Sequence, residues 1–561
     1  MVDSAFNAYL EWIKTNGGSF QKINFRKDLH GEGCVYTTDT VKESEQFATV
    51  PFKICITEKV ARKALPTLTD FSGRVVQSLF LLLQKNLGER SFYYPYINIL
   101  PKRIVTAMHF DEEDMAYLQK TNMELAVRER KAALQSEFTR LLEHLPENVH
   151  KEDVRWEDFL WAHSMYSSRA FPYKLIDPSS TEESEVLFPL VDALNHKPNT
   201  KITWSRSGDS ETGSLTFVAG QEYQVGDEIF NNYGPKSNEE LLIGYGFCFE
   251  YNEYDHIALK PNFSQDLNYQ VKLDILQNCG ISSGNTDPYT FYIHRNNVPP
   301  MFFKMMRVLV MNNMETAYYR SCHDLKFLDM VGYRNELSML SMTLTLLKTR
   351  LIALKSVDLD TSDNIPAWRK FALMYRAGQE DVYNVTITKI EEMKSRIISC
   401  MNQDIKENRM APNVPFLSIV NPDYEYTSLT IDSSPFISLD MVIITLDSLL
   451  RKNDPFSTAI TEIFEDFDEE ADVIFMLSLI NEKFNENSKW KEFFRRISSS
   501  DTTVSQDEQE LKEMYDSMIP EFSEAYPHVF SLGKFSFESF VWADNILNNY
   551  SIDNPLAIVP L

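Results

Sequence analysis

The chain has 561 residues, 43% of them hydrophobic and 24% charged, which is enough for two or three globular domains with sizeable cores. Its net charge of −26 at pH 7 argues against nonspecific binding to nucleic acid; the charge either attracts basic partners or only keeps the protein soluble, and the sequence leaves both interpretations open. No apolar run approaches the length of a membrane span, and the six cysteines form no C-x-x-C pair, so we expect no membrane helix, zinc site or disulfide framework.

The start of the chain lacks the basic and apolar regions of a signal peptide. Together with the scattered cysteines, this predicts a cytoplasmic protein, with the nucleus as an alternative location. Residues 4–17 have apolar residues at helical spacing and end in two glycines, which predicts an amphipathic helix. Two strand-like pieces follow at 30–36 and 47–51. The first contains Gly31-Glu32-Gly33, where glycine would let the backbone approach a ligand closely, although Gly-x-Gly is also common in ordinary turns.

Residues 72–170 are rich in helical patterns. The run 111–145 is long, charged and amphipathic, and the run 156–171 reads WEDFLWAHSMYSSRAF. A polar loop at 177–184 separates these helices from the next apolar strand.

The stretch 187–249 carries the most distinctive pattern in the chain. Two runs rich in β-branched and aromatic residues, 201–204 and 214–218, flank turn residues and predict a hairpin. Residues 229–233 predict a further strand, and Ser237, with Glu240 at capping-box spacing, predicts the start of a short helix. The ordered pieces are VDALNH at 191–196, GDEI at 226–229, NNYG at 231–234, SNEELL at 237–242 and YGF at 245–247.

This ordered set resembles the catalytic half of a SET-domain protein-lysine methyltransferase. It is most similar to the subclass typified by the Rubisco large-subunit methyltransferase and the fungal ribosomal-protein, elongation-factor and cytochrome c lysine methyltransferases. The resemblance implies an α+β fold, with a SET β-fold of small sheets, a helical insert and a mostly α-helical C-terminal domain. It implies S-adenosylmethionine as the cofactor, no metal ion, and methylation of a lysine side chain. The zinc-binding cysteine clusters of many histone-directed relatives are missing, which favours a non-histone protein substrate.

The resemblance also implies roles for individual residues. Tyr233 stands at the position of the catalytic tyrosine, and Phe171 and Tyr245 stand at positions that line the substrate lysine channel. An aromatic residue at Phe171 favours lysine over histidine, because the family's histidine-methylating relative carries a polar residue there. The residues implied to bind the cofactor are Gly31, Glu32, Gly33, Ser168, Arg169, Asp192, Asn195, His196, Tyr233 and Phe247.

Beyond about residue 265 helical periodicity dominates, for example at 337–354, 385–401 and 441–451. The expected domains are therefore an N-terminal SET segment at 1–71, a helical insert at 72–170, a catalytic SET segment at 171–264 and a helical substrate-binding domain at 265–561.

The stretch 470–561 contains an echo of the insert. FESFVWA at 537–543 parallels WEDFLWA at 156–162, and the echo ends at AIVPL, 557–561, which is similar to LFPL at 187–190. A degenerate second copy, without the Asn-His pair and the catalytic tyrosine, would explain the echo. Amphipathic helices that converged on a similar pattern would explain it equally well, and the sequence does not decide between the two.

A second class of function is a noncatalytic SET-like scaffold that binds proteins, although such a scaffold would have no need of Tyr233, Asn195 and His196. The expected partner is a protein substrate of basic character, with no nucleic acid and no membrane. The acidic run 465–470 is a candidate for steering such a substrate. The sequence does not name the substrate, its lysine, the number of methyl groups added or the oligomeric state.

Overall fold

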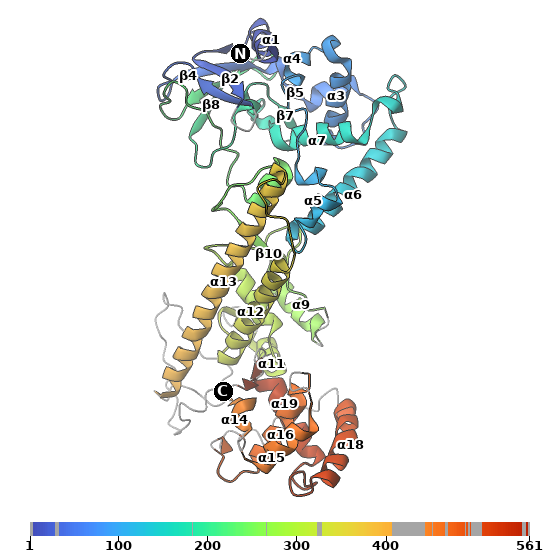
Figure 1. Cartoon of the computed structure of the whole chain (residues 1–561), viewed down its shortest axis with the longest axis vertical. Coiled ribbons are helices and arrows are strands. Elements are labelled where there is room, and N and C mark those ends of the chain that lie inside the picture. The colour runs from blue at the N-terminus through green and yellow to red at the C-terminus, as the bar shows by residue number, and fades with distance from the viewer. Residues whose placement is uncertain are drawn as a thin grey trace. The chain divides into compact units, whose positions relative to one another are not determined.

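The computed structural model describes residues 4–27, 33–181, 183–264, 266, 268–322, 328–406, 444–450, 453–465, 469–488, 490–491, 494, 508–552 and 557–558. The chain divides into two compact units, one of residues 1–256 with 354–380 and one of residues 257–353 with 381–561. Figure 1 labels their elements. The expected domain boundaries near 71, 170 and 264 remain predictions, because these two units group the chain more coarsely.

Three small antiparallel sheets form the framework of the first unit within its described residues. The largest has the strand order β1-β4-β9-β8, and its β8–β9 hairpin pairs without interruption from Ile202 opposite Ala219 to Ser207 opposite Ser214, as the sequence predicts. Along β9 buried and half-buried residues alternate, so one face of the sheet packs into the core. The strands are β1 (Ser19–Phe20), β2 (Ile23–Lys27), β3 (Gly33–Thr37), β4 (Gln46–Pro51), β5 (Ile56–Thr57), β6 (Ala170–Pro172), β7 (Glu185–Leu187), β8 (Ile202–Ser207) and β9 (Ser214–Ala219).

The two smaller sheets bring distant parts of the chain together. β2 and β3 form a hairpin, and in the third sheet β7 lies between β5 and β6 and is antiparallel to both. Ala170 and Phe171, where the helical insert meets the catalytic segment, therefore lie opposite Leu187 and Val186 of the catalytic segment. This pairing fixes the insert beside the residues that carry the sequence motif.

Helices cover these sheets and share one large apolar core with them. α3 and α7 pack against each other, and each contributes a nearly continuous buried surface. The helices are α1 (Ser4–Thr15), α2 (Glu58–Ala64), α3 (Gly73–Leu87), α4 (Tyr94–Ile97), α5 (Glu112–Ala116), α6 (Asn122–Glu143), α7 (Trp156–Arg169) and α8 (Asn238–Gly244), with short 3-10 turns at Phe52–Ile54, Gly88–Arg90, Ala107–His109, Lys151–Asp153, Tyr173–Leu175 and Val191–Ala193.

The segment 354–380 returns from the middle of the chain to the first unit. It includes the first turns of the long helix α13 (Ala367–Lys406), whose Ala372 and Tyr375 complete a second apolar cluster with residues of α5 and α6. Arg369 pairs with Asp114 at 2.6 Å. Because this association spans more than 200 residues of sequence, local pattern alone does not predict it.

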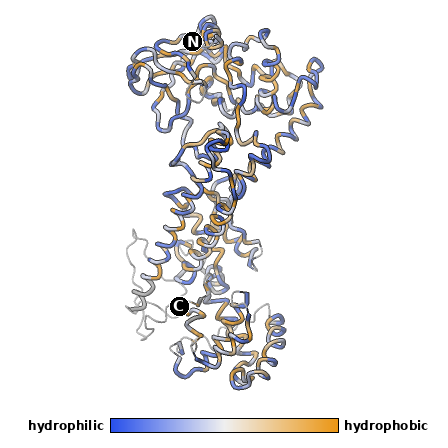
Figure 2. The backbone as a smooth tube through the Cα atoms, in the orientation of Figure 1, coloured by the Kyte–Doolittle hydropathy of each residue, from blue (hydrophilic) through white to orange (hydrophobic). Residues whose placement is uncertain are grey.

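The second unit is mostly helical. Its described helices are α9 (Tyr269–Asn278), α10 (Pro300–Leu309), α11 (Asn313–Cys322), α12 (Tyr333–Lys355), the remainder of α13, α14 (Leu446–Leu449), α15 (Pro455–Ile463), α16 (Ala471–Lys483), α18 (Glu508–Ala525) and α19 (Phe537–Tyr550). Its strands are β10 (His256–Leu259) paired with β11 (Phe291–His294), and β12 (Ile444–Thr445), β13 (Ser551–Ile552) and β14 (Ala557–Ile558) in a sheet of order β12-β14-β13. Figure 2 shows apolar and polar residues alternating along these helices.

One described helix differs from expectation. α12 is long and apolar enough to cross a membrane by length and composition, whereas no such run is expected from the sequence. Half of its most apolar window is buried inside the structure. The helix also carries the buried, ion-paired side chains Arg334 and Glu336, which is a feature of core helices in water.

Two local predictions are wrong in detail. Residues 229–233 are not a strand, because only isolated bridges form there, between Glu228 and Tyr36 and between Asn231 and His196. The helix expected at 441–451 is, within its described residues, the two-residue strand β12 followed by the single turn α14. The predicted capping box at Ser237 and Glu240 is confirmed at the start of α8, and the predicted α+β fold is confirmed as a whole.

Candidate active site

Two motif segments run side by side at the centre of the first unit. The backbone N–H of Asn231 donates to the carbonyl of Asn195 at 2.8 Å, and the N–H of Lys197 donates to the carbonyl of Asn231 at 3.0 Å. The Asn-His segment and the segment that carries Tyr233 are thereby held in one parallel bridge. Because these backbone groups are already paired with each other, 229–233 does not pair in a regular sheet.

His196 links the two segments through its side chain. Its Nδ1 accepts a hydrogen bond from the backbone N–H of Tyr233 at 3.1 Å, and its ring stacks on the Tyr233 ring with centroids 4.8 Å apart. Burial lowers the pKa of His196 from its ordinary value. The imidazole is therefore neutral at pH 7, with Nδ1 as acceptor, and acts as a fixed support under Tyr233.

The Tyr233 hydroxyl has one defined partner. It donates to the carbonyl of Leu194 at 2.9 Å, and the ring lies between His196 and Tyr245, whose centroid is 4.9 Å away. Burial raises the pKa of the Tyr233 phenol well above its usual value. The hydroxyl therefore stays protonated near neutral pH, so it can orient and stabilise a reacting group but cannot serve as a general base there.

Aromatic rings continue from this stack. Tyr245 meets Phe247 at 6.2 Å, and Phe247 meets Phe249 at 5.4 Å, both edge to face. Gly246 makes the turn between them with φ +83°, and a Cβ there would approach the carbonyl oxygen of Val105 to 2.8 Å. The Tyr-Gly-Phe motif thus needs its glycine both for the backbone conformation and for space.

Asn195 joins this arrangement to the β3 strand. Its side-chain amide donates to a Glu228 carboxylate oxygen at 2.8 Å and approaches the carbonyl of Gly33 at 3.4 Å. Gly33 begins β3 and lies opposite Lys27, the last residue of β2. The Asn-His pair, the Gly-Asp-Glu motif and the N-terminal hairpin therefore meet at one place.

A second polar group lies at the end of α7. Arg169 donates from Nη1 to the backbone carbonyl of Asp192 at 2.8 Å, and the buried Asp192 carboxylate accepts from the Tyr96 hydroxyl at 2.6 Å. Burial raises the pKa of Asp192 to about 6, partly offset by Arg169. Arg169 Nε and the other Asp192 carboxylate oxygen, Oδ1, are buried without a hydrogen-bond partner. Buried polar atoms are normally satisfied, so these two atoms mark a place where a bound group would supply the missing hydrogen bonds.

The structure brings most of the sequence-predicted site residues into this one unit. Phe171 lies on β6 and meets Trp204 edge to face at 6.0 Å, while the Ser168 hydroxyl bonds back to the Ser164 carbonyl within α7. Gly31 and Glu32 lie outside the described residues. Sequence reasoning missed Tyr96, Trp204 and the side chain of Glu228; the only local signal was for Glu228, which lies within the GDEI motif.

No group of three or more His, Cys, Asp and Glu side chains suited to a metal ion occurs among the residues that the structure describes. The site contains a protonated, oriented phenol, a wall of aromatic rings, a buried donor (Arg169 Nε) and a buried acceptor (Asp192 Oδ1). These features suit the binding of a small zwitterion and the orientation of a neutral nucleophile.

Comparison with known proteins identifies the fold of this site. The SET domain family matches residues 33–234. The chain is 28% identical to the ribosomal lysine N-methyltransferase set10 of Schizosaccharomyces pombe over 66% of this chain and 69% of that protein. It is 22% identical to the protein-lysine N-methyltransferase EFM1 of Saccharomyces cerevisiae over 96% of this chain and 94% of that protein.

The chain is also similar to a histidine methyltransferase and to a solved SET-domain structure. The actin-histidine N-methyltransferase of Mus musculus is 29% identical over 55% of this chain and 53% of that protein. The crystal structure of the SET domain of LSMT bound to lysine and AdoHcy superposes with a TM-score of 0.59 at 18% identity, over 71% of this chain and 93% of that one, and supports the fold. Residues 33–234 are therefore a SET domain, and the chain is a protein-lysine methyltransferase with S-adenosylmethionine as its cofactor, as the sequence predicts.

Proposed function

We propose that this enzyme methylates the side-chain amine of a lysine in a non-histone protein, of the translation-factor, ribosomal-protein or cytochrome c type. The observation that carries the proposal is the Tyr233 phenol, which is protonated, stacked between His196 and Tyr245, and hydrogen-bonded to the Leu194 carbonyl. The name of the set10 relative, a ribosomal lysine N-methyltransferase, favours a ribosomal substrate.

The substrate amine must be neutral to react. A free lysine with pKa near 10.4 costs about 4.6 kcal/mol to deprotonate at pH 7. The half-buried rings of Tyr245 and Phe171 would lower this cost, because an apolar wall disfavours the ammonium. Tyr233 would then align the amine, and its contribution is positioning and electrostatics without a covalent step.

Several residues would hold the cofactor, which supplies an electrophilic methyl group when bound. Arg169 Nε is a buried donor suited to its carboxylate, and Asp192 Oδ1 a buried acceptor suited to its ammonium. Asn195, His196 and Gly33 would contribute through the backbone and amide groups where their segments meet, and Phe247 would offer a ring to the adenine. Ser168, Gly31 and Glu32 complete the proposed set by position in the family motif.

The choice of lysine over histidine rests on Phe171. Its ring lies against Trp204, so the wall at this point is apolar and aromatic. A methylated histidine would require a polar partner for the second ring nitrogen, and a phenylalanine ring offers none.

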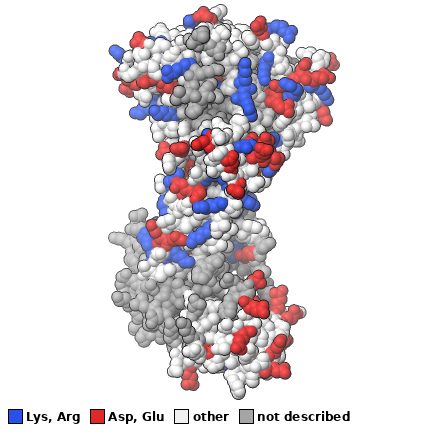
Figure 3. All heavy atoms as spheres, in the orientation of Figure 1, with Lys and Arg blue, Asp and Glu red and all other residues white. Residues whose placement is uncertain are grey.

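A basic substrate is supported by the distribution of charge. α18 carries six acidic residues and one lysine, and Glu510, Glu513, Asp516, Glu521 and Glu524 are exposed. Figure 3 shows acidic side chains gathered over this helix. Such a surface would raise the encounter rate with a basic protein. Of the acidic run 465–470, residues 466–468 lie outside the described residues. We further propose a cytoplasmic location, with the nucleus as the alternative, and no nucleic-acid or membrane partner.

The test uses purified enzyme, tritium-labelled S-adenosylmethionine and three acceptor samples: a ribosome fraction, the ribosome-free cytosolic proteins and purified histones. Wild-type enzyme should label a discrete protein band in one of the first two samples, and Tyr233→Phe should label it far more weakly. Labelling confined to histones, or equal labelling by the variant, would overturn the proposal.

A further inference from the structure

Seven elements of the first unit have counterparts in the same order in the second unit. In the first unit they are β5, α2, α3, α6, α7, β6 and β7, over residues 56–187, with the additional short helices α4 and α5 between α3 and α6. In the second they are β12, α14, α16, α18, α19, β13 and β14, over residues 444–558, with the additional helix α15 between α14 and α16. The packing partners correspond as well: α2 with α3 and α14 with α16, α3 with α7 and α16 with α19, and each last helix with its two following strands.

The small sheets of the two regions have the same topology and register. In both, the last strand lies in the middle and is antiparallel to the other two. Leu187 is opposite both Ile56 and Ala170, and Ile558 is opposite both Ile444 and Ser551. Thr57 and Thr445, one residue later, each cap the helix that follows by accepting a backbone hydrogen bond. The sequence echo ends at 187–190 in the first copy and at 557–561 in the second. These segments begin in β7 and β14, which are the central strands of the two sheets.

Specific side-chain contacts also recur. Lys85 of α3 lies over the Trp161 ring at 4.2 Å, and Lys483 of α16 lies over the Trp542 ring at 4.1 Å. Phe138 of α6 contacts Trp156 and Phe159 of α7, at 5.4 and 5.0 Å between centroids; Tyr515 of α18 contacts Phe537 and Phe540 of α19, at 5.6 and 5.3 Å. Helical periodicity alone produces apolar stripes but does not reproduce a strand register and a lysine–tryptophan contact together.

We infer that residues 444–558 are a second copy of the helical insert, in which the edge that serves the cofactor in the first copy is closed by α11 and α12. The identification of that edge rests on the proposed function. In the first copy it consists of Ser168, Arg169 and Ala170, at the junction of α7 and β6. The equivalent residues at the junction of α19 and β13 are Asn549, Tyr550 and Ser551.

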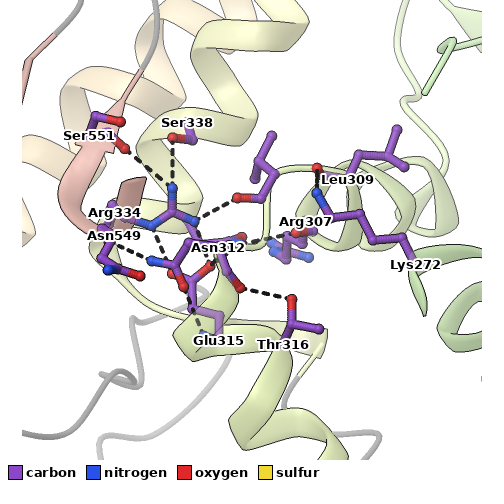
Figure 4. Close-up of polar contacts among 12 residues, drawn as sticks. Lys272, Arg307, Leu309, Asn312, Glu315, Thr316, Arg334, Ser338, Asn549 and Ser551 are labelled. Carbon is purple, nitrogen blue, oxygen red and sulfur yellow. Dashed lines mark hydrogen bonds and ion pairs between the residues drawn. The ribbon is translucent and has the colours of Figure 1, made fainter. Parts of the chain in front are cut away.

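Figure 4 shows how this edge is closed. Arg334, at the start of α12, donates from Nη1 to the carbonyl of Ser551 at 3.3 Å, and the Asn312 amide donates to the carbonyl of Asn549. Arg334 is held in place by Glu315 of α11, with Nε 2.9 Å from Oε1, and by the Val310 carbonyl at 2.6 Å.

Both members of the Arg334–Glu315 pair are buried, with Arg334 9% and Glu315 4% exposed. The guanidinium nitrogens of Arg334 donate to protein groups. The side chain therefore covers the edge of the second copy and leaves no donor free for a ligand. Tyr550 stands where the first copy has Arg169, so the second copy also lacks the cationic group of that edge. The second copy therefore anchors described C-terminal residues to α11 and α12, and its closed edge offers no second cofactor site.

The closed edge is tested on the full-length chain by amide hydrogen exchange and by titration calorimetry with S-adenosylhomocysteine. Arg334→Met should speed exchange at 546–552 at least tenfold, because the Ser551 carbonyl loses its partner. It should leave one site per chain and change the dissociation constant less than twofold. Arg396→Met, at an exposed position of α13, is the control and should change neither reading.

Unchanged exchange at 546–552, or a second cofactor site in the wild-type chain, would overturn the inference. If Arg334→Met does not fold, Asn312→Ala removes the bond to the Asn549 carbonyl, together with the bond that the Asn312 side-chain oxygen accepts from the Glu315 N–H. It should speed exchange at the same amides about threefold, and no change in that variant also overturns the inference. Wild-type protein that binds no S-adenosylhomocysteine would refute the proposed function instead, and the exchange result would still decide whether α11 and α12 close the edge.

The copy relationship is tested separately by matched substitutions. Trp161→Leu should speed exchange in α3 and α7, and Trp542→Leu should speed exchange in α16 and α19, each at least fivefold and each within its own copy. If Trp542→Leu leaves α16 unchanged, the Lys483–Trp542 contact does not hold those helices together, and the equivalence of the two copies fails.

Discussion

Residues 56–187 and 444–558 share a framework but not a site. In both, a central two- or three-residue strand and a pair of packed helices form the core. The first copy has 20 acidic and 17 basic residues, whereas the second has 23 acidic and 9 basic residues, so the second copy is much more acidic in composition. Catalytic groups come from segments outside the framework, such as the Asn-His segment and the segment with Tyr233, which only the first unit brings to it. The same framework can thus carry either chemistry or an anchor, depending on what covers its edge.

The largest effect should come from the Tyr233 hydroxyl. Tyr233→Phe should lower kcat about 10²- to 10³-fold, because removal of one oriented hydrogen-bonding group from an active site typically lowers kcat by this factor. The dissociation constant of S-adenosylhomocysteine should stay within threefold of the wild-type value. Steady-state kinetics and calorimetry measure both quantities. Tyr550→Phe, in the second copy, is the control, and an equal loss of rate there would break the comparison between the two copies.

The first unit should also give the stability of the protein a pH dependence, through Asp192. Burial raises the pKa of Asp192 from 3.8 to about 6. The folded protein therefore binds this proton more tightly than the unfolded chain, so stability falls as pH rises from about 4 to about 6, by about 3 kcal/mol in full. Asp192→Asn should flatten this dependence. Hydrogen exchange across this pH range, corrected for intrinsic rates, should show the difference at 156–169 and none at 537–550; an identical pH profile in the variant would contradict the assignment.

Cofactor binding should depend on Asn195, whose side chain joins the Asn-His segment to Glu228 and Gly33. Asn195→Ala removes the amide that pairs with Glu228 and approaches Gly33, and should weaken S-adenosylhomocysteine binding about 10- to 100-fold. Calorimetry on the full chain gives the affinity. Asn548→Ala, an exposed change on α19, should bind like wild type, and full affinity in Asn195→Ala would remove this residue from the site.

Acceptor choice should respond to Phe171. Phe171→Asn should lower lysine methylation about tenfold, because it replaces an apolar ring in the proposed lysine channel with a polar group that stabilises the ammonium. The ratio of methyllysine to methylhistidine in the labelled product measures the change. Ile552→Val, at the equivalent position of the second copy, is the matched control, and unaltered lysine methylation by Phe171→Asn would move the channel elsewhere.

The smallest effect concerns the acidic helix of the second copy. Changing Glu510, Glu513 and Glu521 to glutamine should raise KM for the protein substrate two- to fivefold at low salt, with kcat unchanged, and the difference should shrink as salt screens the charges. α6, the equivalent helix, has four acidic and four basic residues. Glu129→Gln with Glu143→Gln on α6 is the control. Salt curves that superimpose for the α18 variant and wild type would assign these charges to solubility.

The features that were predictable from sequence are local ones. The capping box at Ser237, the hairpin at β8 and β9 and the N-terminal helix follow from residue spacing over a few positions. The Tyr96–Asp192 bond joins residues 96 positions apart and leaves no local signature. The 229–233 run has strand-like residues, but the backbone of Asn231 pairs with Asn195 and Lys197, so no ladder forms. Strands of two residues, such as β12 and β14, are too short to produce an alternating pattern.

The most direct test of the account is the identity of the methylated atom. Wild-type enzyme is incubated with labelled S-adenosylmethionine and the cytosolic and ribosomal proteins, and the labelled protein is digested and sequenced by mass spectrometry. We predict methyl groups on lysine Nζ of a basic protein, at a far lower level in the reaction with Tyr233→Phe. Methyl groups on histidine, or on lysine at an undiminished level with Tyr233→Phe, would contradict it.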